Sequence, residues 1–67
     1  MNVYHVRLQW STLREDDIVI AADTDSAKNL SLGDNRVSMR KIECTIRLLG
    51  VASEDIVEEE VVLRMVQ

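Results

Sequence analysis

Histidine and cysteine have the widest chemistry of any side chains in this sequence, and each occurs once, as His5 and Cys44. A histidine that acts as a general base needs a nucleophile or a carboxylate beside it. The nearest neighbour of His5 on the same strand face is Arg7, a poor activator. Cys44 alternates with Ile42 and Ile46, which predicts a core position where a thiol behaves as a small apolar group. We therefore expect no catalytic residue and no enzyme activity.

Acidic side chains are more numerous, but their spacing does not indicate a metal site. One histidine and one cysteine cannot complete a closed zinc site within one chain. The acidic runs at 15–17 and 58–60 lack the glycine and the turn spacing of a calcium loop. We interpret both runs as solvated loops and expect neither a metal nor a cofactor.

Charge placement is more informative than any single residue. Basic side chains gather on the expected outer face of a sheet, whereas acidic side chains gather in the expected loops. Complementary charge speeds and orients protein docking, so either set is a candidate interface, and a merely solvated surface is an equal alternative. The candidate partner-binding residues are Arg7, Lys41, Arg47 and Arg64 in the basic set, and Asp16, Asp17, Glu58, Glu59 and Glu60 in the acidic set.

The elements that must position these residues follow from hydrophobic periodicity. Apolar and polar residues alternate over residues 2–10, which predicts a half-buried strand with Tyr4 and Trp10 facing inward. The polar residues 11–17 are predicted to form a hairpin loop, and the β-branched run over 18–22 a second strand.

A short helix is predicted next. Asp or Thr within residues 23–26 would accept a hydrogen bond from the first helical turn, and Gly33 would end the helix with a positive φ. Ala27 and Leu30 would face the sheet together. Because about two turns of helix do not persist alone, this helix must pack on the sheet.

The period of two returns over residues 37–49, which predicts a long strand with Leu48 in the core. A loop over 50–55 then leads to a last segment, 54–66, that is either strand or helix. Ser53 before two acidic residues is typical of a helix start, but the Val-Val-Leu run and the short connection favour a second hairpin.

The predicted fold is therefore α+β: a small antiparallel four-stranded sheet with one short helix packed on one face, in the order strand–strand–helix–strand–strand. With 67 residues, the chain forms a single domain spanning 1–67, because two domains would leave neither with a core. A domain this small has a thin stability margin, so we expect it to gain stability from a partner.

Composition also excludes several classes of function. No apolar run approaches the ~20 residues that span a bilayer, the N-terminus lacks a signal-peptide pattern, and a lone cysteine indicates a reducing, cytoplasmic setting. The net charge of −4 argues against binding to nucleic acid or to an anionic membrane. A sheet that binds RNA would also need outward aromatic residues for stacking, and none is expected.

The segment Ile-Val-Ile-Ala-Ala-Asp-Thr-Asp-Ser-Ala-Lys-Asn-Leu, residues 18–30, resembles the strand, cap and alanine-bearing helix of several very small phage proteins. The element order resembles small phage inhibitors of host RNA polymerase and small anti-CRISPR proteins. This resemblance implies a compact inhibitor that blocks a larger host machine through its surface. No motif matches residue by residue, so the resemblance assigns no residue a role.

These observations favour a non-enzymatic protein-interaction module of phage or mobile-element type, which binds and blocks a larger host protein or nucleoprotein complex. A homo-oligomeric assembly protein, for example a homodimer, is the alternative, because an exposed edge strand can pair with a second copy. The valines expected on the outer face, which would make it less polar, are Val3, Val19, Val62 and Val66. An RNA-binding sheet is a third and weaker hypothesis.

Overall fold

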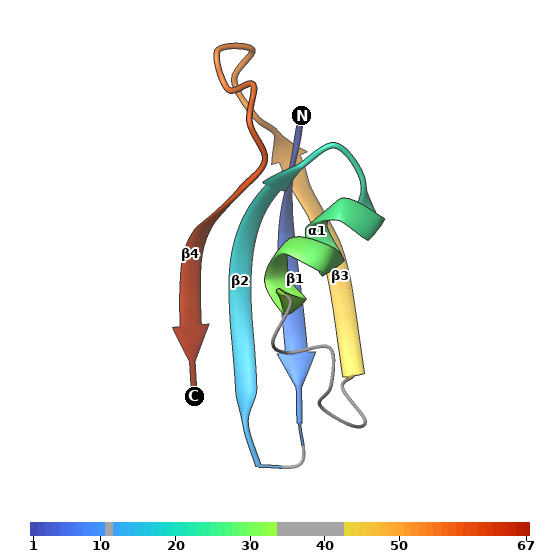
Figure 1. The fold of residues 1–67 in the computed structure, drawn as a ribbon, viewed down its shortest axis with the longest axis vertical. Helices are drawn as coiled ribbons and strands as arrows, with labels where there is room; N and C mark the ends of the chain where they lie inside the picture. Colours follow the sequence, from blue (N-terminus) through green and yellow to red (C-terminus); the bar gives the residue numbers. More distant parts are fainter. Residues whose placement is uncertain (11, 34–42) are drawn as a thin grey trace.

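Four strands and one helix make up the parts of the chain that the computed structural model describes, residues 1–10, 12–33 and 43–67 (Figure 1). The elements in chain order are β1 (Asn2–Gln9), β2 (Arg14–Ala21), α1 (Thr24–Leu32), β3 (Glu43–Val51) and β4 (Glu60–Val66). The α+β class and the order of elements are as predicted, and the last segment is a strand.

The strands form one antiparallel sheet in the order β3-β1-β2-β4. β3 and β4 therefore occupy opposite edges, and the predicted second hairpin is wrong. The chain crosses from one edge to the other through residues 52–59, which project beyond the end of the sheet near the N-terminus (Figure 1). Three strand spacings are only about 14 Å, so this connection is long enough to pass β1 and β2.

The core lies between α1 and the two central strands. Alternate residues of β1 point to the helix, and their partners on β2 and α1 complete a small aliphatic cluster with one aromatic ring. The fully enclosed members are Tyr4, Val6, Leu8, Val19, Ala21 and Ala27. Cys44, predicted to be a core residue, is half-buried at the margin of this cluster. Val19, predicted to face outward, is instead buried in it.

The helix ends are those that the sequence predicts. The Asp23 side chain accepts a hydrogen bond from the Ser26 amide at 2.8 Å, and Gly33 ends the helix with a φ of 61°. Ala27 is fully buried against the sheet and Leu30 is partly buried beside it. The helix packs mainly over β2 and β1, so the two edge strands receive little cover.

That narrow cover explains why the prediction for Leu48 is wrong. Leu48 pairs with Tyr4 and shares its sheet face, but 59% of the residue is exposed because β3 lies at the edge of the sheet. The strand predicted over 37–49 begins at Glu43 and extends to Val51 in the described residues. Residues 34–42, and with them the candidate Lys41, lie outside the described residues.

The second strand begins earlier than predicted. The Trp10 amide donates to the Leu13 carbonyl at 2.8 Å, which closes a short turn, and pairing with β1 starts at Arg14. The acidic run 15–17 therefore lies inside β2 and not in a solvated loop. The carboxylates are tolerated there because cationic side chains contact them on both faces of the sheet.

Candidate binding surface on the open sheet face

The sheet face opposite the helix, which we call the open face, carries a regular arrangement of side chains fixed by cross-strand pairing. Two central rows run from β3 through β1 and β2 to β4. The first row is Arg47, His5, Ile18 and Leu63, and the second is Thr45, Arg7, Asp16 and Met65. The β3 side of this face is thus cationic and the β4 side is largely apolar.

Asp16 is the centre of a charged cluster on this face. Its Oδ1 accepts a hydrogen bond from Arg7 Nε at 2.9 Å and lies 2.8 Å from His5 Nε2, while its Oδ2 lies 3.5 Å from Arg14 Nε. The Asp16 side chain is only 8% exposed. Hydrogen bonds from Arg7 and then from His5 lower its pKa below the usual range, against the opposing effect of burial. Asp16 is therefore a carboxylate that its hydrogen bonds stabilise in the ionised form, and it does not lie in a solvated loop as predicted.

Arg7 and Arg47, two of the predicted basic residues, line one open hollow of about 230 Å³ together with His5 and Thr45. We call it the basic hollow. Arg7 donates a hydrogen bond from its Nε to Asp16, and its side chain is 45% exposed. No hydrogen bond or ion pair joins Arg47 to any other residue in the described part of the chain. The hollow therefore presents guanidinium groups that can accept a further anion.

His5 has a neighbour that the sequence prediction missed. Periodicity pairs it with Arg7 alone, but β2 brings Asp16 beside the ring because the strand begins at Arg14. This histidine–carboxylate pair resembles the orienting half of a catalytic dyad. Asp16 is shared with Arg7, however, and within the described ranges no hydroxyl or thiol is hydrogen-bonded to the His5 ring.

The predicted position of Arg64 on this outer face is wrong. Leu63 pairs with Ile18 and Val61 pairs with Val19, so Val62 is the extra residue of a β-bulge. The bulge breaks the alternation of β4 and turns Arg64 to the helix side of the sheet. A bulge leaves no signal in a hydrophobic pattern of this length.

On the helix side, Arg64 contacts a buried ionic cluster. Its Nε lies 3.3 Å from both Asp17 Oδ1 and Glu15 Oε2, and its Nη2 donates to the Ser31 carbonyl at 3.1 Å. The Glu15 and Asp17 residues are 1% and 0% exposed. Burial raises the pKa of Asp17, with Glu15 adding to the shift and Arg64 opposing it. The cluster joins β2, β4 and α1, and Asp17 is not accessible to a partner.

The remaining acidic candidates lie at one end of the molecule. Glu58, Glu59 and Glu60 are exposed, in the β3–β4 connection and at the start of β4. A Glu59 carboxylate oxygen accepts a hydrogen bond from the Ala22 amide at 2.8 Å, which attaches the connection to the end of β2. The predicted acidic set is therefore divided: Asp16 contacts Arg7 on the open face, Asp17 is buried, and the three glutamates lie around the start of β4, away from the residues that line the basic hollow.

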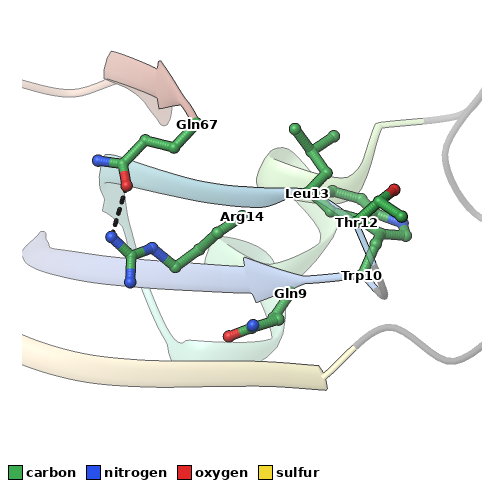
Figure 2. Close-up of a pocket in the computed structure, with 6 residues that line it drawn as sticks. All are labelled: Gln9, Trp10, Thr12, Leu13, Arg14 and Gln67. Atoms are coloured by element: carbon green, nitrogen blue, oxygen red, sulfur yellow. Dashed lines mark hydrogen bonds between the residues drawn. The ribbon is translucent and has the colours of Figure 1, made fainter.

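A second hollow, of about 340 Å³, lies beside the β1–β2 turn (Figure 2). Its lining residues are Gln9, Trp10, Thr12, Leu13, Arg14 and Gln67. Arg14 donates a hydrogen bond to the Gln67 side chain, and the two lie side by side across β2 and the end of β4 (Figure 2). Because its one cation already contacts Gln67 and Asp16, we do not assign this hollow a ligand.

Several large apolar side chains are exposed along the edge strand β4. They are Val62, Leu63, Met65 and Val66. Leu63 and Met65 belong to the open face, whereas Val66 pairs with Glu15 on the helix side. Val62 and Val66 are both exposed, but the prediction that Val66 lies on the outer face is wrong, because the bulge shifts the alternation of β4 and places Val66 on the helix side.

Comparison with known proteins finds no family model, no curated protein and no solved structure that matches this chain. The resemblance to small phage inhibitors and anti-CRISPR proteins stays a prediction. Among the described residues, no helix is long and apolar enough to cross a membrane. In the same residues, no group of three histidine, cysteine or acidic side chains is placed to hold a metal ion.

Proposed function

We propose that this protein is a non-enzymatic interaction module that binds a partner protein through its open face. The observation that carries the proposal is the basic hollow, whose Arg47 has no ion-pair partner among the described residues, on the same sheet face as the exposed apolar side chains of Leu63 and Met65. Arginine and methionine are enriched in protein interfaces, and arginine is also enriched among the residues that contribute most to binding. Strands also hold these side chains in fixed relative positions, which reduces the entropy lost on binding.

More specifically, we propose that the partner is a larger host protein or nucleoprotein complex. The module would block this partner by covering part of its surface. This more specific proposal rests on the resemblance to small phage inhibitors that we infer from the order of elements in the sequence. It places the protein in a reducing cytoplasm, where the free, half-buried Cys44 would persist as a thiol because burial raises its pKa.

Affinity capture from host lysate, compared between wild-type and Arg47→Glu protein, tests the proposal. Arg47 is exposed, so its reversal is expected to leave thermal stability nearly unchanged while reducing capture of the partner at least tenfold. Glu58→Lys is the matched control, a charge reversal on the acidic end, and it is expected to capture normally. Loss of capture in the control with normal capture by Arg47→Glu would move the interface to the acidic end.

A second function, homo-oligomeric assembly, is favoured by the β4 edge. An edge strand with exposed apolar residues and no lysine or proline resembles a strand that pairs with another copy. Sedimentation equilibrium separates the two functions. A monomer at all protein concentrations would exclude homo-oligomeric assembly. A dimer that dissociates when Val66→Lys is introduced would support it.

A further inference from the structure

The basic hollow has a charge excess in its immediate surroundings. The two central rows of the open face contain two arginines, Arg7 and Arg47, and one carboxylate, Asp16. Glu43 lies in the next row on one side, opposite Gln9, and Glu60 lies in the next row on the other side, opposite Ile20 at the β4 edge. The hollow is therefore locally positive in a chain whose net charge is −4.

The contact with Asp16 shows that Arg7 and His5 already bind a carboxylate of this chain. One carboxylate oxygen lies within 2.9 Å of both Arg7 Nε and His5 Nε2. A guanidinium carries five N–H donors in a planar fork that matches a carboxylate, and the hydrogen bond from Arg7 to Asp16 uses only one of them. None of the Arg47 donors is hydrogen-bonded to another of the described residues.

We infer that the basic hollow is a carboxylate site, which receives a glutamate or aspartate side chain of the partner between Arg47 and Arg7. This inference rests on the proposed function and names the chemistry of the partner's contact. A protein carboxylate is favoured over a nucleic-acid phosphate, because the acidic chain would repel a polyanion and both aromatic residues pack on the helix side, where they cannot stack on bases.

The same face defines a second requirement for the partner. An ion pair open to solvent changes a binding equilibrium by no more than about fivefold, so the carboxylate must be accompanied by apolar contact. Ile18 and Leu63 continue the row that begins with Arg47 and His5. Because three strand spacings separate β3 from β4, the partner's acidic and apolar side chains lie about 14 Å apart, or about four residues in an extended chain.

The test is a titration of isotope-labelled protein with a short peptide that carries glutamate and leucine about four residues apart, followed by amide chemical shifts. Saturable shifts are expected at His5, Arg7, Thr45 and Arg47. The matched peptide with glutamine in place of glutamate is expected to bind about three- to fivefold more weakly, the effect of one ion pair open to solvent. Arg47→Gln protein, with its fold checked by thermal unfolding, is expected to lose the same factor.

Equal binding of the glutamine peptide, shifts confined to another surface, or no binding at all would overturn the carboxylate site. The same shifts with inorganic phosphate or single-stranded RNA, at lower concentration than with the peptide, would assign the hollow to phosphate instead. If partner capture depends on Arg47 while the acidic peptide does not bind, only the inferred chemistry fails. If capture is independent of Arg47, the proposed function itself fails.

Discussion

Asp16 and Asp17 are neighbours in sequence but ionise in opposite surroundings, because successive residues of β2 point to opposite faces of the sheet. On the open face, hydrogen bonds from Arg7 and His5 lower the pKa of Asp16. On the helix face, burial raises the pKa of Asp17. One residue is thus stabilised as an anion, and the other is destabilised as one.

Asp17→Asn tests this difference through the pH dependence of folding. A carboxyl whose pKa is raised by folding stabilises the protein fully below its unfolded pKa, and this contribution is lost as pH rises through the folded pKa. The free energy of unfolding of the wild type should therefore fall as pH rises above about 4, and this part of the pH dependence should be absent in the Asn variant. Glu15, Arg64 and Ser31 remain in place around the substituted side chain. Urea unfolding across this range measures the slopes, and equal slopes would contradict the account.

Asp16→Asn is expected to act in the other direction. The lowered pKa of Asp16 gives stability that is present above its unfolded pKa and lost as pH falls through the folded pKa. The substitution replaces the charged acceptor of Arg7 by a neutral amide oxygen and removes the ion pair with Arg14, which should cost about 1–3 kcal/mol at neutral pH. Glu60→Gln, an exposed change, is the control and should stay within about 0.5 kcal/mol. Matching urea midpoints for the two variants would contradict this role.

At the scale of elements, the sequence predicts correctly wherever the cause is local. The alternation of β1, the Asp23 cap and the Gly33 end of α1 depend on residues within a few positions, and the structure has all three. The acidic start of β2 and the bulge in β4 depend on a contact between Asp17 and Arg64, which are 47 positions apart. No local pattern carries that information.

The Asp23 cap gives a prediction for the helix. Asp23→Ala removes the acceptor of the Ser26 amide and should destabilise the protein by about 0.5–2 kcal/mol. Asp25→Ala, in the same first turn, removes only a favourable interaction with the helix dipole and should cost less. Thermal unfolding of the two variants, with circular dichroism of the helix, provides the comparison. Greater loss in Asp25→Ala would show that the cap is not what positions α1.

At the scale of the whole molecule, the described residues form a four-stranded sheet of which α1 covers only the centre. The core is therefore small, and apolar side chains at both edges are exposed. The two-layer class was predictable from element order. The strand order was not, because the choice of edge strands depends on which pairs bury most surface together. The site was predictable in part, since Arg7 and Arg47 meet as expected whereas Arg64 and Asp17 lie on the helix side.

The uneven cover predicts different costs for two leucines of the same sheet face. Leu8→Ala should cost about 2–5 kcal/mol because Leu8 is fully buried among the core residues. Leu48→Ala should cost no more than about 0.5 kcal/mol in the isolated chain, because most of this residue is exposed. Urea denaturation at low protein concentration measures both. An equally large cost at Leu48 would mean that a second copy covers the β3 edge.

The central claim is that the open face receives the partner. Its most direct test is the amide and methyl chemical-shift map of isotope-labelled protein bound to the captured partner. The largest changes are expected in the row that crosses all four strands, at His5, Arg47, Ile18 and Leu63. Changes confined to α1 or to residues 52–59, with the open face unaffected, would contradict it.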